Sequence, residues 1–239
     1  MSQLMGSMFS ASFVQAIARA GVVEGNVRPV VDVWLTELDE LCIALRNGAI
    51  TQAGWQEQID ASLVRVARAD LLRAIDYQRL TERVSFADHH EYQTRLHLPG
   101  GESLTFSPWF FAIDKGGAVV PHGHHNLVTM HMILNGTARG RQFERVHDEP
   151  EFMTIQPTLD AVLKPGAVST ISDEHNNVHW FAAIGGPVHT FNMQLVVDSS
   201  ERVAGRDYVD PAHGEKLGSG LIRARRLEQQ EAYQLYGRS

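Results

Sequence analysis

The spacing of apolar residues along the chain changes near residue 88. Before that point they recur at every third or fourth position, as on one buried face of an α-helix. One helix is predicted to begin near Pro29 and to end at Asn47-Gly48, and a second is predicted to follow its N-cap, Thr51. The two apolar stripes consist of Val30, Val33, Trp34, Leu38, Leu41, Cys42 and Leu45, and of Trp55, Ile59, Leu63, Val66, Leu71, Leu72 and Ile75.

Residues 1–88 are therefore predicted to form a helical N-terminal region, which includes an earlier helix ending near Arg19. A layer packed on the main domain is the favoured interpretation, with a dimerisation element or a lid as the alternatives. Apolar stripes must be covered by something. The stripes around Trp34 and Trp55 look ample for covering the rest of one chain, so a homodimer is predicted.

Residues 89–200 show a different pattern, with short stretches rich in β-branched and aromatic residues. Turn signals such as Asn135-Gly136 and Gly185-Gly186-Pro187 separate these stretches. Many short strands at this spacing predict an all-β sandwich or barrel. Residues 201–239 are more polar, and they are predicted to be a C-terminal extension that is irregular at first and helical over residues 221–236.

Composition excludes several classes of protein. A formal net charge of −7 argues against nucleic acid or an anionic membrane as the main partner. The single cysteine, Cys42, excludes an intramolecular disulfide framework and a thiolate cluster. No apolar run approaches the length of a membrane span, and no basic segment precedes the mild apolar stretch at the N-terminus. A cytoplasmic protein that acts on a small molecule is expected.

The histidines between residues 122 and 131 are the chemically most informative feature of the sequence. His122 and His124 are two residues apart at the mouth of a predicted strand, so their side chains can point to the same face. Neutral imidazole is a common metal ligand, and two on one face with a third from elsewhere make an open metal site. The pair therefore predicts a metal centre.

The same stretch resembles the first motif of the cupin superfamily, G-x5-H-x-H-x3,4-E-x6-G. Gly116, His122, His124 and Gly136 fit its spacing, and Thr129 stands where the motif has a glutamate ligand. A weaker resemblance to the second cupin motif runs from Gly166 to Ala183 and places His179 at the histidine position. In that second stretch Glu174, Asn176 and Ala183 replace the Pro, Gly and Asn of the motif, and His175 is a rival for the ligand role.

The resemblance implies a mainly β fold, the cupin double-stranded β-helix or jelly-roll barrel, with a metal inside its mouth. It also implies a three-histidine site of His122, His124 and His179, similar to that of cysteine-dioxygenase-like iron cupins. Iron(II) is the metal that this resemblance favours, while the ligands themselves leave zinc, manganese, nickel and copper open.

A mononuclear non-haem iron(II) dioxygenase of a small polar substrate, such as a thiol or a dicarbonyl, is the function implied. A non-redox lyase, isomerase or hydrolase is one alternative, and a binding or sensing module is another, because a fold does not fix a function.

Three further residues are candidates for catalysis. His131 shares the parity of Thr129, so its side chain is expected to point into the barrel, about 7 Å deeper. It is expected to act as a general base or as a partner that orients the ligands. If a bulge shifts the register, His131 would be a ligand itself. His189 is either a substrate contact or a core histidine. Arg139 heads an alternating series with Arg141 and Arg145, one of which would clamp an anionic substrate if that face points inward.

Overall fold

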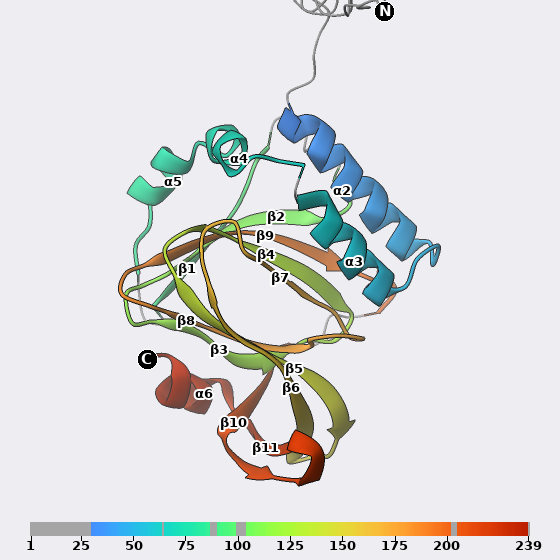
Figure 1. Ribbon diagram of the computed structural model, residues 1–239, viewed down its shortest axis with the longest axis vertical. Helices are drawn as coiled ribbons and strands as arrows, with labels where there is room; N and C mark the ends of the chain where they lie inside the picture. The colour runs from blue at the N-terminus through green and yellow to red at the C-terminus, as the bar shows by residue number, and fades with distance from the viewer. Residues whose placement is uncertain (1–29, 64, 87–89, 99–103, 202–204, 239) are drawn as a thin grey trace, which may run out of the picture.

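Residues 30–63, 65–86, 90–98, 104–201 and 205–238 are described by a computed structural model of the chain (Figure 1). Two antiparallel sheets face each other, and the N-terminal helices cover the outer face of one of them. This is the mainly β, cupin-like jelly roll with N-terminal helices that the sequence predicted. The helix expected to end near Arg19 lies outside the described residues.

The helical layer contains both predicted stripes, but the second stripe is divided between two helices. Ala67 has an extended backbone (φ −71°, ψ 130°), which separates the helices on either side of it. None of the helices in the described ranges has the length and apolarity to cross a membrane. The helices are α2 (Val30–Arg46), α3 (Gln52–Leu63), α4 (Arg68–Ala74) and α5 (Tyr77–Glu82).

The first sheet has the strand order β1-β2-β9-β4-β7. Along β4, Met130 and Met132 pack with the helices, while Thr129 and His131 point to the opposite face, into the space between the two sheets. The bounds of the strands are β1 (Glu91–Arg95), β2 (Ser107–Ile113), β4 (Leu127–Asn135), β7 (Val168–Ile171) and β9 (Val188–Val196).

The second sheet closes on itself in the order β3-β8-β5-β6-β11-β10, because β10 also pairs with β3. A separate apolar cluster, which includes Phe143, Met153 and Ile222, fills the lobe where β10 and β11 meet β5 and β6. The strands are β3 (Ala118–Gly123), β5 (Ala138–Asp148), β6 (Phe152–Leu163), β8 (Val178–Ala183), β10 (Asp207–Lys216) and β11 (Ile222–Leu227).

The C-terminal extension is partly helical, as predicted, but its helix begins later than expected and the segment before it forms strands rather than irregular chain. Residues 207–227 contribute the antiparallel pair β10 and β11, and only α6 (Gln229–Tyr236) is helical, apart from a short 3-10 turn at Gly218–Gly220. The reason is a period of two rather than 3.6: Ile222 and Ala224 are buried, and the arginine between them points outward.

Both tryptophans that motivated the homodimer lie inside a single chain. Trp34 and Trp55 are buried in the cluster formed by the helical layer and the first sheet, and the ring of Trp34 lies 5.8 Å from that of Phe191 on β9. Most of both stripes is therefore covered by the chain's own sheet, whereas Val30 and Val33 of the first stripe remain 56% and 44% exposed. The homodimer stays a prediction.

Candidate metal centre

The three predicted ligands lie together between the two sheets. His122 on β3 pairs directly with His179 on β8, and His124 follows immediately after the end of β3. One ring nitrogen from each of the three lies within 4.8 Å of the others. His122 Nε2 and His124 Nε2 are 3.1 Å apart. His179 is more than fifty positions from His122 and His124 in the sequence, and the fold brings its imidazole to the same point as theirs.

Hydrogen bonds to the backbone leave the metal-facing nitrogens free. His122 Nδ1 donates to the carbonyl oxygen of Val120 at 2.7 Å, and His179 Nδ1 donates to the carbonyl oxygen of Asn177 at 3.4 Å. A histidine that donates from Nδ1 keeps a lone pair on Nε2, which is how proteins commonly orient metal-binding imidazole. These two rings therefore fit a metal ligand role.

Burial keeps the three imidazoles neutral at pH 7. Desolvation, together with the neighbouring histidines and the Arg206 guanidinium, holds the pKa of His122 and His179 well below the usual range. Burial and Arg206 lower the pKa of His124 to about 3. Neutral imidazole is the form that binds metal, so the donor set fits a divalent cation.

The neighbouring residues on β4 occupy the positions that their parity predicted. Thr129 is buried and lines the same cavity as the three histidines, so no carboxylate is present where the cupin motif has glutamate. His131 lies deeper, with its ring 5.7 Å from that of His179, and burial lowers its pKa to about 4. It is not part of the three-histidine cluster.

A cavity of about 310 Å³ lies in front of the cluster, which is room for a small molecule. Arg206 lines this cavity and brings a positive charge to it. Its guanidinium is held in place by the Tyr233 hydroxyl at 3.2 Å and by Glu91, 3.9 Å away. The other lining residues that distinguish the cavity are Gln93, Trp109 and Gln194.

Arg206 is a candidate site residue that the sequence interpretation missed. It precedes β10, and the next residues of that strand pair with the metal site, because Tyr208 lies opposite His122. No local pattern marked it, because buried and exposed residues do not alternate along β10, and the segment was interpreted as irregular. The cation at the site therefore comes from the C-terminal extension.

The arginines proposed to clamp the substrate lie outside the barrel. On β5 the buried positions are Ala138, Gly140 and Gln142, so the alternating arginines point away from the cavity. Arg139 donates to the Asp160 carboxylate at the surface, and Arg141 lies over the Trp180 ring. Arg139 as a substrate contact was wrong, because the pleat directs its side chain into solvent.

His189 also faces away from the site. On β9, Thr190 and Gln194 line the interior, whereas His189 and Phe191 point toward the helical layer. His189 Nδ1 lies 2.6 Å from the Tyr77 hydroxyl on α5. It is a core histidine with a partner, and its proposed role in catalysis was wrong.

The second cupin-like stretch departs from the motif for identifiable reasons. Asn176, which replaces a glycine of the motif, has φ 57°. This is the left-handed region, where glycine is most common and asparagine is well tolerated. His175 is largely exposed and contacts Glu144, so it does not compete with His179 as a ligand.

The sequence matches no protein-family model and no curated protein. Among solved structures, the chain resembles an 11S globulin from Wrightia tinctoria, with a TM-score of 0.38 and 14% identity over 53% of this chain and 29% of the globulin. It resembles KdgF from Halomonas sp., with a TM-score of 0.36 and 12% identity over 50% of this chain and 92% of that one. A structure of oxalate oxidase is similar at a TM-score of 0.35 and 16% identity, over 47% of this chain and 54% of that one.

The chain spans about a third of the length of the globulins and the vicilin that it matches. Likeness at this level carries no conclusion about activity. In this chain two antiparallel sheets face each other in a jelly-roll fold, and the three histidines between them form a candidate metal site.

Proposed function

We propose that this chain is a mononuclear iron(II)-dependent dioxygenase of a small anionic substrate. The observation that carries the proposal is the set of His122, His124 and His179, which converge on one point and, among the residues that the structure describes, are joined by no carboxylate. A neutral face of three ligands leaves about three positions of an octahedral metal for other molecules. That number suits a bidentate substrate together with dioxygen.

The three histidines would hold the metal through their ring nitrogens. Iron(II) bound there would supply one-electron chemistry with dioxygen, which no side chain of the site supplies by itself. The neutral ligand set leaves the full positive charge of the cation at the site, and this charge favours an anionic substrate.

Arg206 supports the same substrate class from beside the histidines, because it directly precedes the residues of β10 that pair with Gly123 and His122. A guanidinium binds a carboxylate with paired, charge-assisted hydrogen bonds. Because Glu91 and Tyr233 fix its position, Arg206 would bind one end of the substrate while the other end faces the histidines. An anionic carboxylate bearing a thiol or a carbonyl group fits this arrangement.

His131 would serve proton transfer behind the ligands. It is neutral at pH 7, since burial holds its pKa at about 4, and its Nε2 is 3.5 Å from the Thr129 hydroxyl. A neutral imidazole can accept a proton from a bound substrate or from a hydroxyl that contacts it. Thr129 itself keeps the position next to the metal free of a competing carboxylate.

The test is an oxygen-uptake screen of protein that has been loaded with iron(II) under anaerobic conditions. Small thiol carboxylates and dicarbonyl acids are supplied one at a time, and oxygen consumption is compared with product formed. The proposal predicts consumption of one O₂ per substrate, which disappears in the His179→Ala protein. Substrate conversion without oxygen uptake would contradict it and would favour a non-redox metal enzyme.

A further inference from the structure

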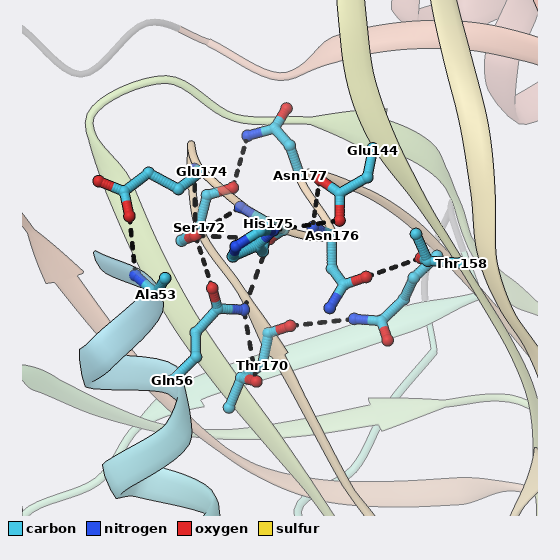
Figure 2. A network of polar contacts seen from close by, with 11 residues as sticks. Ala53, Gln56, Glu144, Thr158, Thr170, Ser172, Glu174, His175, Asn176 and Asn177 are labelled. Atoms are coloured by element: carbon cyan, nitrogen blue, oxygen red, sulfur yellow. Dashed lines mark hydrogen bonds and ion pairs between the residues drawn. The ribbon is translucent and has the colours of Figure 1, made fainter. Parts of the chain in front are cut away.

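The loop between β7 and β8, residues 172–177, is fixed by contacts with two other parts of the fold (Figure 2). On the helical side, the Ser172 hydroxyl donates to Gln56 Oε1 at 2.7 Å, and the backbone N–H of Ala53 donates to the Glu174 carboxylate at 2.9 Å. On the other side, the Glu144 carboxylate accepts from the backbone N–H of Asn176 at 3.2 Å. Helix α3 and strand β5 thus hold this loop between them.

Asn177, the last residue of the loop, contacts two of the three candidate ligands. Its side-chain amide nitrogen donates to the carbonyl oxygen of His124 at 2.8 Å and to that of Ser172 at 3.0 Å. Its own carbonyl oxygen accepts from His179 Nδ1 at 3.4 Å. Only 1% of Asn177 is exposed, so solvent does not compete for these bonds. One residue therefore links the position of His124 to the orientation of His179.

The same side chain explains the glycine between His122 and His124. A Cβ atom on Gly123 would lie 2.5 Å from Asn177 Oδ1, which is closer than non-bonded atoms approach. It would also lie 3.3 Å from a methyl group of Val178. Gly123 does not have a positive φ, so its backbone conformation is open to other residues. The glycine is needed because the Asn177 amide occupies the space of a side chain.

We propose that Asn177 is a positioning residue, which sets His124 and His179 at the spacing that one divalent metal ion requires. Gly123 leaves room for it, and the bond between Ser172 and Gln56 of α3 fixes the loop that carries it. The inference rests on the metal site of the proposed function, but not on its oxygen chemistry. Partners that orient metal-ligating histidines typically change metal affinity by 10- to 100-fold when they are removed.

The test is a double-mutant cycle on the full chain, with Co²⁺ as the probe. Asn177→Ala is expected to weaken Co²⁺ binding about 10- to 100-fold and to change the visible absorption of the bound ion, which reports its coordination geometry. Gly123→Ala is expected to weaken binding as well, because the new methyl group displaces the Asn177 amide. In the double variant the Asn177 amide is absent, so the new methyl group at position 123 no longer clashes with it. Adding Gly123→Ala to Asn177→Ala is therefore expected to reduce Co²⁺ affinity little further.

Thr158→Ala is the matched control, because it removes a hydrogen bond from the outer side of the same loop. Its hydroxyl donates to Asn176 Oδ1 at 2.7 Å and contacts neither ligand. Co²⁺ affinity and absorption should be unchanged in this variant. If Asn177→Ala does not fold, Gly123→Ala tests the same contact with every hydrogen-bonding group in place.

Wild-type Co²⁺ affinity and spectrum in Asn177→Ala, or strictly additive effects in the cycle, would overturn the proposal. Failure of the wild-type chain to bind Co²⁺ would overturn both this inference and the proposed function. Wild-type Co²⁺ binding with loss of affinity in Asn177→Ala, together with no oxygen uptake by iron-loaded protein, would reject the dioxygenase and leave the role of Asn177 standing.

Discussion

The hydroxyl oxygen of Thr129 lies 3.5 Å from Nε2 of His131, on the face of β4 that lines the cavity with the three clustered histidines. Thr129 is 1% exposed, so its side chain is enclosed with these histidines rather than in solvent. A glutamate at position 129 would therefore place a carboxylate in the same cavity as the three histidines.

Replacing Thr129 with glutamate should convert a three-histidine site into a site with an added carboxylate. The metal should be held more tightly, and turnover should fall because one of the open positions is filled. Metal affinity and oxygen uptake measured on the same preparation check both effects. Thr129→Val is the control for shape, and it should not tighten metal binding. Unchanged affinity and activity in Thr129→Glu would show that position 129 does not reach the metal.

Arg206 should determine the affinity for anions. Acetate, titrated into protein loaded with Zn²⁺, is expected to bind about 10- to 100-fold more weakly in Arg206→Met, since hydrogen bonds to charged groups contribute about 1.5–3 kcal/mol. Arg206→Lys should recover part of the loss. Arg139→Met provides the control, because Arg139 is paired with Asp160 at the surface. Equal acetate affinity in the wild-type and Arg206→Met proteins would remove Arg206 from the substrate site.

The metal-free protein should lose stability in mild acid. The pKa values of His124 and His131 are lowered to about 3 and about 4 in the folded state, and an unfolded histidine titrates near 6.5. Below that pH the unfolded chain binds more protons, so stability is present above pH 6.5 and is lost as the pH falls toward the folded values. Each such histidine contributes a slope of about 1.4 kcal/mol per pH unit.

Urea unfolding of the metal-free protein at pH 7, 6 and 5 measures this slope. The His131→Leu variant should show a shallower decline than the wild type, because one buried titrating group is gone. A free energy of unfolding that does not change between pH 7 and 5 would contradict the buried, neutral state of these histidines.

His189 should matter for stability and not for the metal. Its removal takes away the 2.6 Å partner of the half-buried Tyr77 hydroxyl, and a typical hydrogen bond contributes about 0.5–1.5 kcal/mol. His189→Ala is therefore expected to lower the urea midpoint while metal content stays at the wild-type level. A stable variant with reduced turnover would restore the role in catalysis that the sequence suggested.

Two members of the histidine cluster could be predicted from sequence because their signal is local. His122 lies in β3 and His124 follows directly after it, at a spacing of two that is visible in the sequence. The parity that aimed Thr129 and His131 inward follows from the pleat of β4 alone. For the same reason the helices and the short strands were recognisable from their periods.

The rest of the site depends on which face of a strand is covered, and a single sequence does not specify that. The alternation along a strand shows which residues share a face with Arg139 or with His189, but not whether that face is the inner one. In the fold, the interior lies on the opposite side of both strands. Arg206 reaches the cavity only because β10 pairs with β3, a contact between residues more than eighty positions apart. Such long-range pairing left no local pattern to interpret.

The metal content of the purified protein is the most direct test of the account. Wild type, His179→Ala and His175→Ala are loaded with iron(II) without oxygen, passed through a desalting column and analysed for bound metal. The account predicts about one metal ion per chain in the wild type and in His175→Ala, and a near-complete loss in His179→Ala with the fold retained. Full metal occupancy in His179→Ala would contradict the three-histidine centre.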